Sequence, residues 1–242
     1  MSDVKVSIES RNKEDHPLVA SLLAILLVVL CLWASVWQFN RGTARHELNS
    51  RIASHISQGP TSLEKIALNI DDAEWRKISI DGTFDSSHQI LLRNRYSEGK
   101  YGFDLLTLFT ATSGQSFWVD RGWIAPGADA TSTPKLPITP KTQVSILGRV
   151  RLDHSLPRGS FFAIPTNNKE NLISRWNAQA QYANGTEKYY VDLLDSSDPQ
   201  LKPGSPVELP ELTDGPHMAY ALQWLFFAGM VVYGRILLRR SR

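Results

Sequence analysis

The stretch LVASLLAILLVVLCLWASVW occupies residues 18–37 and contains no charged side chain. At about 1.5 Å per residue, an α-helix of this length crosses the hydrocarbon core of a bilayer, which is about 30 Å thick. The run is longer than the apolar core of a secretory signal peptide, and Trp37-Gln38-Phe39-Asn40-Arg41 follows it in place of a small-residue cleavage site. The sequence therefore predicts a first transmembrane helix that is retained as an anchor.

A second apolar run, PHMAYALQWLFFAGMVVYG, occupies residues 216–234 and contains no Asp, Glu, Lys or Arg. It is followed by the basic tail RILLRRSR. Its length predicts a second transmembrane helix. The expected organisation is a tail at 1–17, helices at 18–37 and 216–234, one extramembrane domain at 38–215 and a tail at 235–242.

Lys and Arg counts beside the spans predict the orientation of the chain. Four arginines follow the second span, whereas only Lys202 lies in the about fifteen residues before it. The positive-inside rule then places both tails in the cytoplasm and the domain at 38–215 in the periplasm. The first span gives no preference, because basic residues are balanced on its two sides: Lys5, Arg11 and Lys13 before it, Arg41, Arg45 and Arg51 after it. Acidic residues in the leader argue against a mitochondrial transit peptide and favour a bacterial inner membrane.

Composition excludes several functional classes. The net charge of +2 over 242 residues gives no indication of nucleic-acid binding. The single cysteine, Cys31, lies inside the first span and leaves the domain without disulfides. Thiol redox chemistry, a Cys-X-X-Cys copper site and a zinc ribbon are excluded with it, since their thiolate ligands are missing.

The domain reads as α+β with β dominant, a mainly antiparallel sheet or barrel with one helical insertion. Apolar spacing after the first span predicts an amphipathic helix that ends at Gly59-Pro60. A second helix is expected at 168–179, and loops at 126–140 and 196–216. Short alternating runs predict strands at 75–81, 88–93, 101–112, 116–124, 143–152 and 188–194.

His217 is the histidine that stands out, because it begins the second span, where an ionisable group is costly unless it is partnered or functional. At 100° per residue, His217, Ala221, Trp224 and Ala228 form one stripe of the helix with Tyr220 beside it. This stripe could receive a planar macrocycle with His217 as an axial ligand to haem iron. The alternative is an interfacial histidine with Tyr220 and Trp224 in an aromatic belt and the two alanines as helix-packing positions. The other histidines, His16, His46, His55, His88 and His154, read mostly as solvated surface residues.

The remaining candidates favour binding over catalysis. Gln223 is expected to hydrogen-bond to a neighbouring helix or a partner protein. Arg93 and Arg95 form either a basic rim for a partner or a solvated strand end. Asp120 and Arg121 point to opposite faces of a strand, with no second carboxylate nearby, and Gly122 suggests a bulge or a close backbone approach. Neither a G-X-S-X-G elbow nor a Ser, His, Asp order is present, so we expect no enzyme.

Six short motifs follow one another along the chain. They are Trp37-Gln38 with Arg41, Gly82-X-Phe84, Arg93-Asn94-Arg95 with Gly102, Val119-Asp120-Arg121-Gly122-Trp123-Ile124, Gly148-Arg149-Val150-Arg151, and His217-Met218-Ala219-Tyr220-Ala221-Leu222-Gln223-Trp224. With two terminal spans, this order makes the chain resemble the surfeit locus protein 1 family of cytochrome oxidase assembly factors. The chain has Ser35-Val36 where that family often has Leu-Gly.

The resemblance implies a non-enzymatic membrane protein that assists haem a insertion into the catalytic subunit of a haem-copper oxidase. It implies haem a as the cofactor, with His217 at the matching position and Tyr220 and Trp224 beside it. The implied partners are the oxidase catalytic subunit, other assembly factors and membrane lipid. The residues expected to contact them are Trp37, Gln38, Arg41, Arg93, Arg95, Arg121 and Gln223. The competing hypothesis is a permanent accessory subunit of a respiratory complex that binds no cofactor.

Overall fold

The computed structural model describes residues 16–128, 134–152, 163–165 and 186–240. The chain divides into two compact units. One, the helical unit, comprises residues 1–50 and 212–242, and the other, the sheet unit, comprises residues 51–211. The helix expected at 168–179 lies outside the described residues.

Two helices in the described part of the chain are long and apolar enough to cross a membrane. α1 runs over Pro17–Ser57 and α5 over His217–Arg240. Both expected spans are therefore helical. α1 has no break between the span and the amphipathic helix expected after it. α5 continues past Gly234 because Leu and Arg favour helix, and the last-turn arginines Arg239 and Arg240 suit the helix C-terminus.

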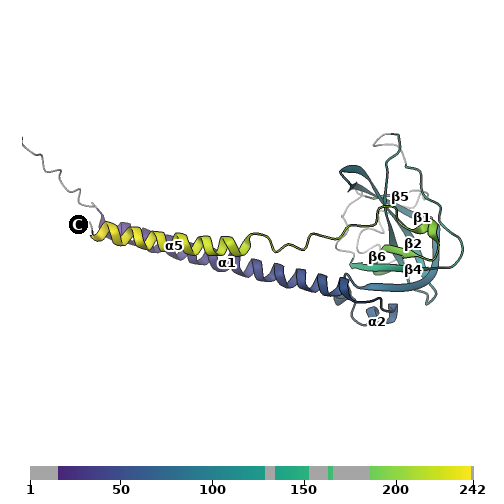
Figure 1. Cartoon of the computed structure of the whole chain (residues 1–242), viewed down its shortest axis with the longest axis horizontal. Helices are drawn as coiled ribbons and strands as arrows, with labels where there is room; N and C mark the ends of the chain where they lie inside the picture. The colour runs from purple at the N-terminus through teal and green to yellow at the C-terminus, as the bar shows by residue number, and fades with distance from the viewer. Residues whose placement is uncertain (1–15, 129–133, 153–162, 166–185, 241–242) are drawn as a thin grey trace, which may run out of the picture. The chain divides into compact units, whose positions relative to one another are not determined.

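The helical unit is held by close packing and by polar contacts between α1 and α5, which lie side by side (Figure 1). Ser35 Oγ donates a hydrogen bond of 2.9 Å to the carbonyl of Ala221. Ala221 and Ala228 are buried, as expected where small side chains let two helices approach. Near the other end of α5, Arg235 Nη2 donates to Ser21 Oγ and to the Pro17 carbonyl, each at 2.8 Å.

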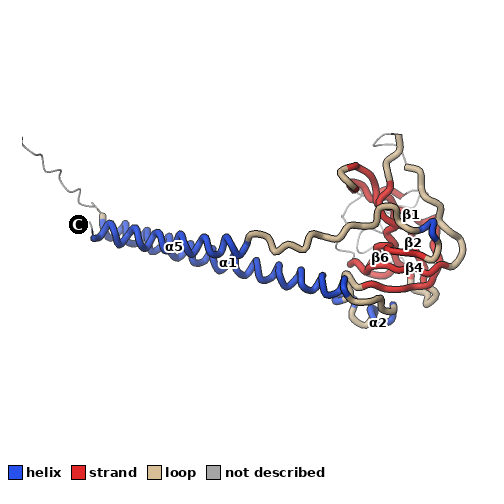
Figure 2. The backbone as a smooth tube through the Cα atoms, viewed as in Figure 1, coloured by secondary structure: helices blue, strands red, loops and turns tan. Residues whose placement is uncertain are grey.

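The sheet unit is built from strands, drawn in red in Figure 2. They are β1 Lys77–Ser97, β2 Lys100–Ala111, β3 Ser116–Ile124, β4 Val144–Leu152, β5 Ala163–Pro165 and β6 Thr186–Ser196. The short helices α2 Leu63–Ala67 and η1 Ile70–Asp72 precede β1, and η3 Pro199–Leu201 follows β6.

The strand order is β2-β3-β6-β4-β1-β5, and β1 also pairs with β2. The pairings thus follow a closed circuit through β1, β2, β3, β6 and β4. All pairs are antiparallel except β3 with β6. The described sheet is therefore mainly antiparallel, as the sequence predicted, and its one parallel pair, β3 with β6, makes it mixed.

β1 joins the strands expected at 75–81 and 88–93 into one. Its first part, Lys77–Gly82, pairs with β4, and from Gly82 onward it pairs with β2. Register shifts at Asp85/Gln89 and at Leu92/Arg95 mark bulges, which bend a strand and let it change partners. The core of the unit is aromatic, and its largest fully buried side chains include Phe103, Phe109, Phe117 and Trp118.

Candidate functional site

His217 is paired with a side chain of the facing helix. Its Nδ1 lies 3.0 Å from Gln38 Oε1. Because an amide oxygen only accepts, this contact requires the proton on Nδ1 and leaves the lone pair on Nε2. A histidine that binds a metal through one ring nitrogen usually donates from the other in the same manner. Gln38 and His217 therefore have the geometry of a ligand and its orienting partner.

Gly215 lies within van der Waals reach of the His217 ring. Gly215 precedes α5 with φ of +68°, and a Cβ there would lie 3.8 Å from His217 Nε2. A larger side chain at this position would occupy the space next to the nitrogen with the lone pair. Gly42 performs a related role on α1, where a Cβ would come within 3.2 Å of His217 Cβ.

A hollow of about 290 Å³ opens beside His217 in the helical unit. It is lined by Arg41, Ala44, Arg45, Leu48 and His217. Arg41 and Arg45 are one helical turn apart and so share a face of α1. Sequence reasoning singled out Arg41 and His217, and the structure brings them together here; it did not single out Arg45.

The aromatic candidates flank the same side of the helix pair. With 100° per residue, Tyr220 and Trp224 lie within about 60° of His217 around α5, and Trp37 lies within about 40° of Arg41 around α1. Tyr220 and Trp37 are about half exposed. Trp224 packs edge-on against Phe227, with ring centroids 5.7 Å apart. Gln223 is exposed and points further around α5.

Asp214 fastens the start of α5 to α1. Its carboxylate accepts a hydrogen bond of 2.9 Å from Asn49 Nδ2 and lies 2.7 Å from His46 Nδ1. The His46 and Asn49 hydrogen bonds lower the pKa of Asp214. Arg45 Nε donates to the neighbouring Thr213 carbonyl at 3.3 Å. These contacts fix residues 213–215, which lead directly into His217.

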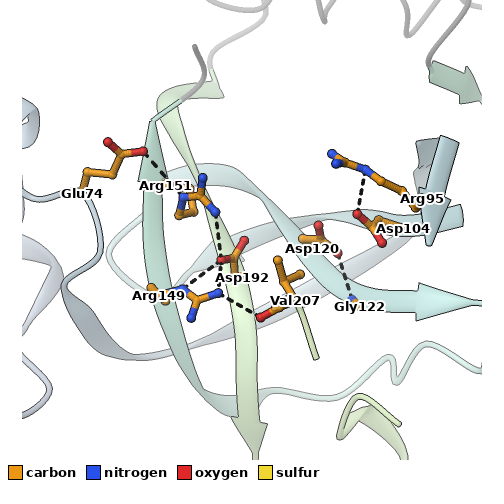
Figure 3. A network of polar contacts seen from close by, with 9 residues as sticks. All are labelled: Glu74, Arg95, Asp104, Asp120, Gly122, Arg149, Arg151, Asp192 and Val207. Atoms are coloured by element: carbon orange, nitrogen blue, oxygen red, sulfur yellow. Dashed lines mark hydrogen bonds and ion pairs between the residues drawn. The ribbon is translucent and has the colours of Figure 1, made fainter. Parts of the chain in front are cut away.

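The sheet unit contains a second polar site, a buried network of acids and arginines (Figure 3). Arg149, Asp192 and Asp120 lie in one row across β4, β6 and β3. Arg149 Nη2 lies 2.7 Å from Asp192 Oδ2, and Arg151 Nη1 lies 3.5 Å from the same oxygen. Asp192 is fully buried and Arg149 nearly so. The buried Asp192 carboxylate is thus paired with two arginines, one of which, Arg151, also pairs with Glu74.

Asp120 and Asp104 extend the network with further carboxyl groups, so the expectation that no second carboxylate lies near Asp120 is wrong. Burial raises the pKa of Asp120 well above its usual value, and the carboxylates of Asp104 and Asp192 raise it further. Burial likewise raises the pKa of Asp104 to about 6, although Arg95 opposes the shift. Arg95 Nε lies 2.9 Å from Asp104 Oδ2 as an ion pair, but its N–H direction does not satisfy hydrogen-bond geometry. Like charges placed this closely in a sheet are relieved when one of them holds a proton.

The motifs Arg93-Asn94-Arg95 and Asp120-Arg121-Gly122-Trp123 meet at this network. The bulge at Leu92/Arg95 contains Asn94, whose φ is +61°. A cavity of about 230 Å³ lies next to the bulge. Its lining includes Arg95, Asp104, Trp123 and the segment 205–208.

Residues 203–208 form a strap over this part of the sheet. Trp123 N–H donates to the Ser205 carbonyl at 3.1 Å, and Arg149 Nη2 donates to the Val207 carbonyl at 3.1 Å. Gly122 has φ of +94°, and a Cβ there would lie 2.6 Å from the Ser205 oxygen. The close backbone approach expected at Gly122 is therefore confirmed.

Several expected contact residues occupy different environments. Arg121 is buried, and its guanidinium donates to Thr139 Oγ1 and the Ile138 carbonyl, each at 2.8 Å. Burial lowers the pKa of Arg121 to about 10. Arg121 therefore holds a loop, and its contact with a partner stays a prediction. Arg93 and Arg95 are partly exposed. His55, expected at the surface, is buried with Nδ1 2.7 Å from the Glu74 carbonyl, whereas His154 lies outside the described residues.

Sequence reasoning missed Asp104, Asp192 and Asp214. Asp104 and Asp192 lie inside strands that were recognised, flanked by apolar residues on both sides. A charged residue in the middle of a buried strand was the signal that could have found them. Asp214 gave no such signal, because it lies in a polar linker and its partners on α1 are distant in the sequence.

Comparison with known proteins places these features in context. A model of the SURF1 family matches residues 25–229. An uncharacterised SURF1-like protein of Mycobacterium tuberculosis is 25% identical over 237 residues, covering 92% of this chain and 86% of the relative. Surfeit locus protein 1 of Gallus gallus is 25% identical over 241 residues, covering 87% of this chain and 72% of the relative. The Xenopus tropicalis protein of the same name is 23% identical over 257 residues, covering 94% of this chain and 78% of the relative.

The chain has two helices that are long and apolar enough to cross a membrane, and a mixed-sheet unit lies between them in the sequence. This organisation is that of a protein with two membrane-spanning candidates and one extramembrane unit. The family match covers most of the chain. The chain belongs to the SURF1 family, and the resemblance drawn from its motifs is confirmed.

Proposed function

We propose that this protein is an assembly factor for haem-copper cytochrome c oxidase that assists haem a insertion into the catalytic subunit. Membership of the SURF1 family and the similarity to surfeit locus protein 1 support the oxidase-assembly role. The observation that carries the haem step is the His217–Gln38 contact, which leaves the lone pair on Nε2 of His217, a residue that lines the hollow. No enzymatic activity is part of this proposal.

The helical unit provides residues that fit haem a. His217 would hold the iron through Nε2, and Tyr220 and Trp224 would lie on the same side of α5 against the macrocycle. When bound, the haem supplies an iron that accepts the imidazole lone pair. Gln38 fixes the tautomer and orientation of His217, and Asp214 holds residues 213–215 in place through Asn49.

The proposed location is a bacterial inner membrane, with both termini in the cytoplasm and the sheet unit in the periplasm. The four arginines from Arg235 onward support this orientation through the positive-inside rule. The exposed apolar side chains of α1 and α5 support contact with lipid. In this arrangement Trp37, Arg41 and Gln223 are available to the oxidase subunit at the helices, and Arg93 and Arg95 at the sheet unit.

The first test is haem binding by the purified full-length protein. Added haemin should produce an absorbance shift typical of histidine ligation, and His217→Ala should abolish it. His88→Ala is the matched control, since His88 lies in the sheet unit and should bind haem no differently from wild type. The absence of any shift with the wild-type protein would reject the haem step.

The second test separates assembly factor from accessory subunit. The His217–Gln38 contact would also serve as a simple interhelical hydrogen bond in a permanent subunit, which is the alternative function. Deletion of the gene should lower oxidase activity and the haem a signal of the membranes, while mature oxidase purified from wild-type cells should lack this chain. Its presence in equal amount with the catalytic subunit would favour the accessory subunit instead.

A further inference from the structure

Two guanidinium groups face the hollow next to His217. Arg41 and Arg45 both line it, together with the apolar side chains of Ala44 and Leu48. The residues of α1 from 17 to 46 and the whole of α5 include no Asp or Glu. Glu47, the next acid along α1, does not line the hollow, nor does Asp214, whose carboxylate interacts with Arg45 and binds His46 and Asn49. The hollow therefore carries more positive than negative charge.

The positions of these arginines along α1 relate them to His217. Gln38 is the residue of α1 that lies opposite His217, because the two side chains are hydrogen-bonded. At about 1.5 Å per residue, the backbones of Arg41 and Arg45 lie about 4.5 and 10.5 Å further along α1. This direction leads away from the uncharged run at 18–37. A ligand bound at His217 thus meets two cations on the side remote from the apolar span.

We propose that Arg41 and Arg45 bind the carboxylate groups on the edge of the haem macrocycle whose iron is held by His217. This inference rests on the proposed function, because it concerns the same site. Arg guanidinium groups bind carboxylates through paired charge-assisted hydrogen bonds. Haem presents its carboxylates on one edge, so the arginines define how the macrocycle is oriented in the hollow. Arg41 and Arg45 act as positioning and specificity residues, and His217 supplies the ligand.

The test compares haemin with haemin dimethyl ester, in which both carboxylates are uncharged. Both compounds are titrated into the full-length protein in neutral detergent and followed by absorbance. The wild type should bind haemin at least about tenfold more tightly than the ester, since each charge-assisted contact is worth about one factor of ten. The double variant Arg41→Gln, Arg45→Gln should bind both compounds with the affinity that the wild type has for the ester. Its absorbance maximum should be unchanged, because His217 still binds the iron.

Arg51→Gln is the matched control, since Arg51 lies on α1 but does not line the hollow. It should retain the wild-type preference for haemin. Equal affinity of the wild type for haemin and the ester, with the histidine signature intact, would overturn the inference and leave the haem step standing. Binding of neither compound would overturn both.

A phospholipid headgroup is the competing occupant, and the same titration in lipid nanodiscs distinguishes it. Nanodiscs of phosphatidylcholine and of phosphatidylglycerol should give the same preference for haemin over the ester. Loss of that preference in phosphatidylglycerol alone would show that lipid phosphate occupies the arginines and would overturn the assignment to haem carboxylates.

Discussion

Asp104 links the stability of the sheet unit to pH. Its pKa is raised from 3.8 to about 6, chiefly by burial. Between these values the folded chain retains a proton that the unfolded chain has lost. The stabilising contribution of protonated Asp104 is therefore complete below about pH 4 and is lost as pH rises through about 6.

The first prediction follows from this loss of stability with rising pH. Wild-type protein should lose more stability than Asp104→Asn between pH 4 and pH 6.5, by about 2 kcal/mol in the free energy of unfolding. Thermal unfolding of the detergent-solubilised full-length protein measures the difference across this range. Asp195→Asn is a control, because Asp195 is an exposed acid whose pKa is lowered, first by its hydrogen bond to Lys202. Parallel pH profiles for wild type and Asp104→Asn would contradict the assignment.

Gln38 gives a second prediction at the scale of one side chain. Gln38→Leu removes the acceptor for His217 Nδ1–H, so the imidazole loses its fixed tautomer and orientation. Haemin affinity should fall about 10- to 100-fold, as for other partners of metal-binding histidines, while histidine ligation persists. Gln38→Glu, which keeps an acceptor oxygen, should restore most of the affinity in the same absorbance titration. An unchanged dissociation constant for Gln38→Leu would show that His217 needs no partner.

At the scale of elements, the sequence located most strands but not their partners. β3 was predicted at 116–124 and occurs at Ser116–Ile124, because its alternation and flanking turns are local signals. The parallel pairing of β3 with β6 depends on segments about seventy residues apart, which no local pattern specifies. The sequence predicts two strands in place of β1, because the polar residues Asp85–Ser87 interrupt the alternation of apolar and polar residues.

In the candidate site too, single residues could be predicted from the sequence, whereas their partners could not. His217 was identifiable because a histidine at the start of an apolar span is unusual. Its pairing with Gln38 required knowledge of how α1 and α5 align. The row Arg149, Asp192 and Asp120 likewise needed the register of three strands, which a shift of one residue would destroy.

The third prediction concerns the close packing of Gly122 against the strap at residues 203–208. Gly122→Ala places a methyl group 2.6 Å from the Ser205 carbonyl oxygen and forces alanine to a φ near +94°. We expect the free energy of unfolding to fall by about 2–4 kcal/mol. Gly114→Ala separates the two causes, since Gly114 has the same φ of +94° and no neighbour within 4 Å. It should cost about 1 kcal/mol, as measured by denaturant unfolding. Equal losses of unfolding free energy in Gly122→Ala and Gly114→Ala would show that residues 203–208 move aside without destabilising the protein.

For the whole molecule, hydropathy alone located both helices that are long and apolar enough to cross a membrane, because apolar length is encoded in consecutive residues. The prediction at this scale concerns sidedness. In a Cys31→Ser background, a cysteine introduced by Ser113→Cys should react with a membrane-impermeant maleimide in intact spheroplasts. One introduced by Ser241→Cys should react only after the membrane is opened, as four arginines beside the second span require. The reverse labelling pattern would place the sheet unit in the cytoplasm.

The position of β6 has a consequence for how the chain is made. β6 is the last strand to be synthesised, yet it lies between β3 and β4 in the finished sheet. The ribosome therefore releases β3 and β4 with open edges, which can pair with other chains until residues 186–196 emerge. Pairing across such sequence distances is slow, so we expect the nascent chain to be most prone to aggregation in that interval. Variants that weaken β6 should appear in cells first as aggregation or proteolysis.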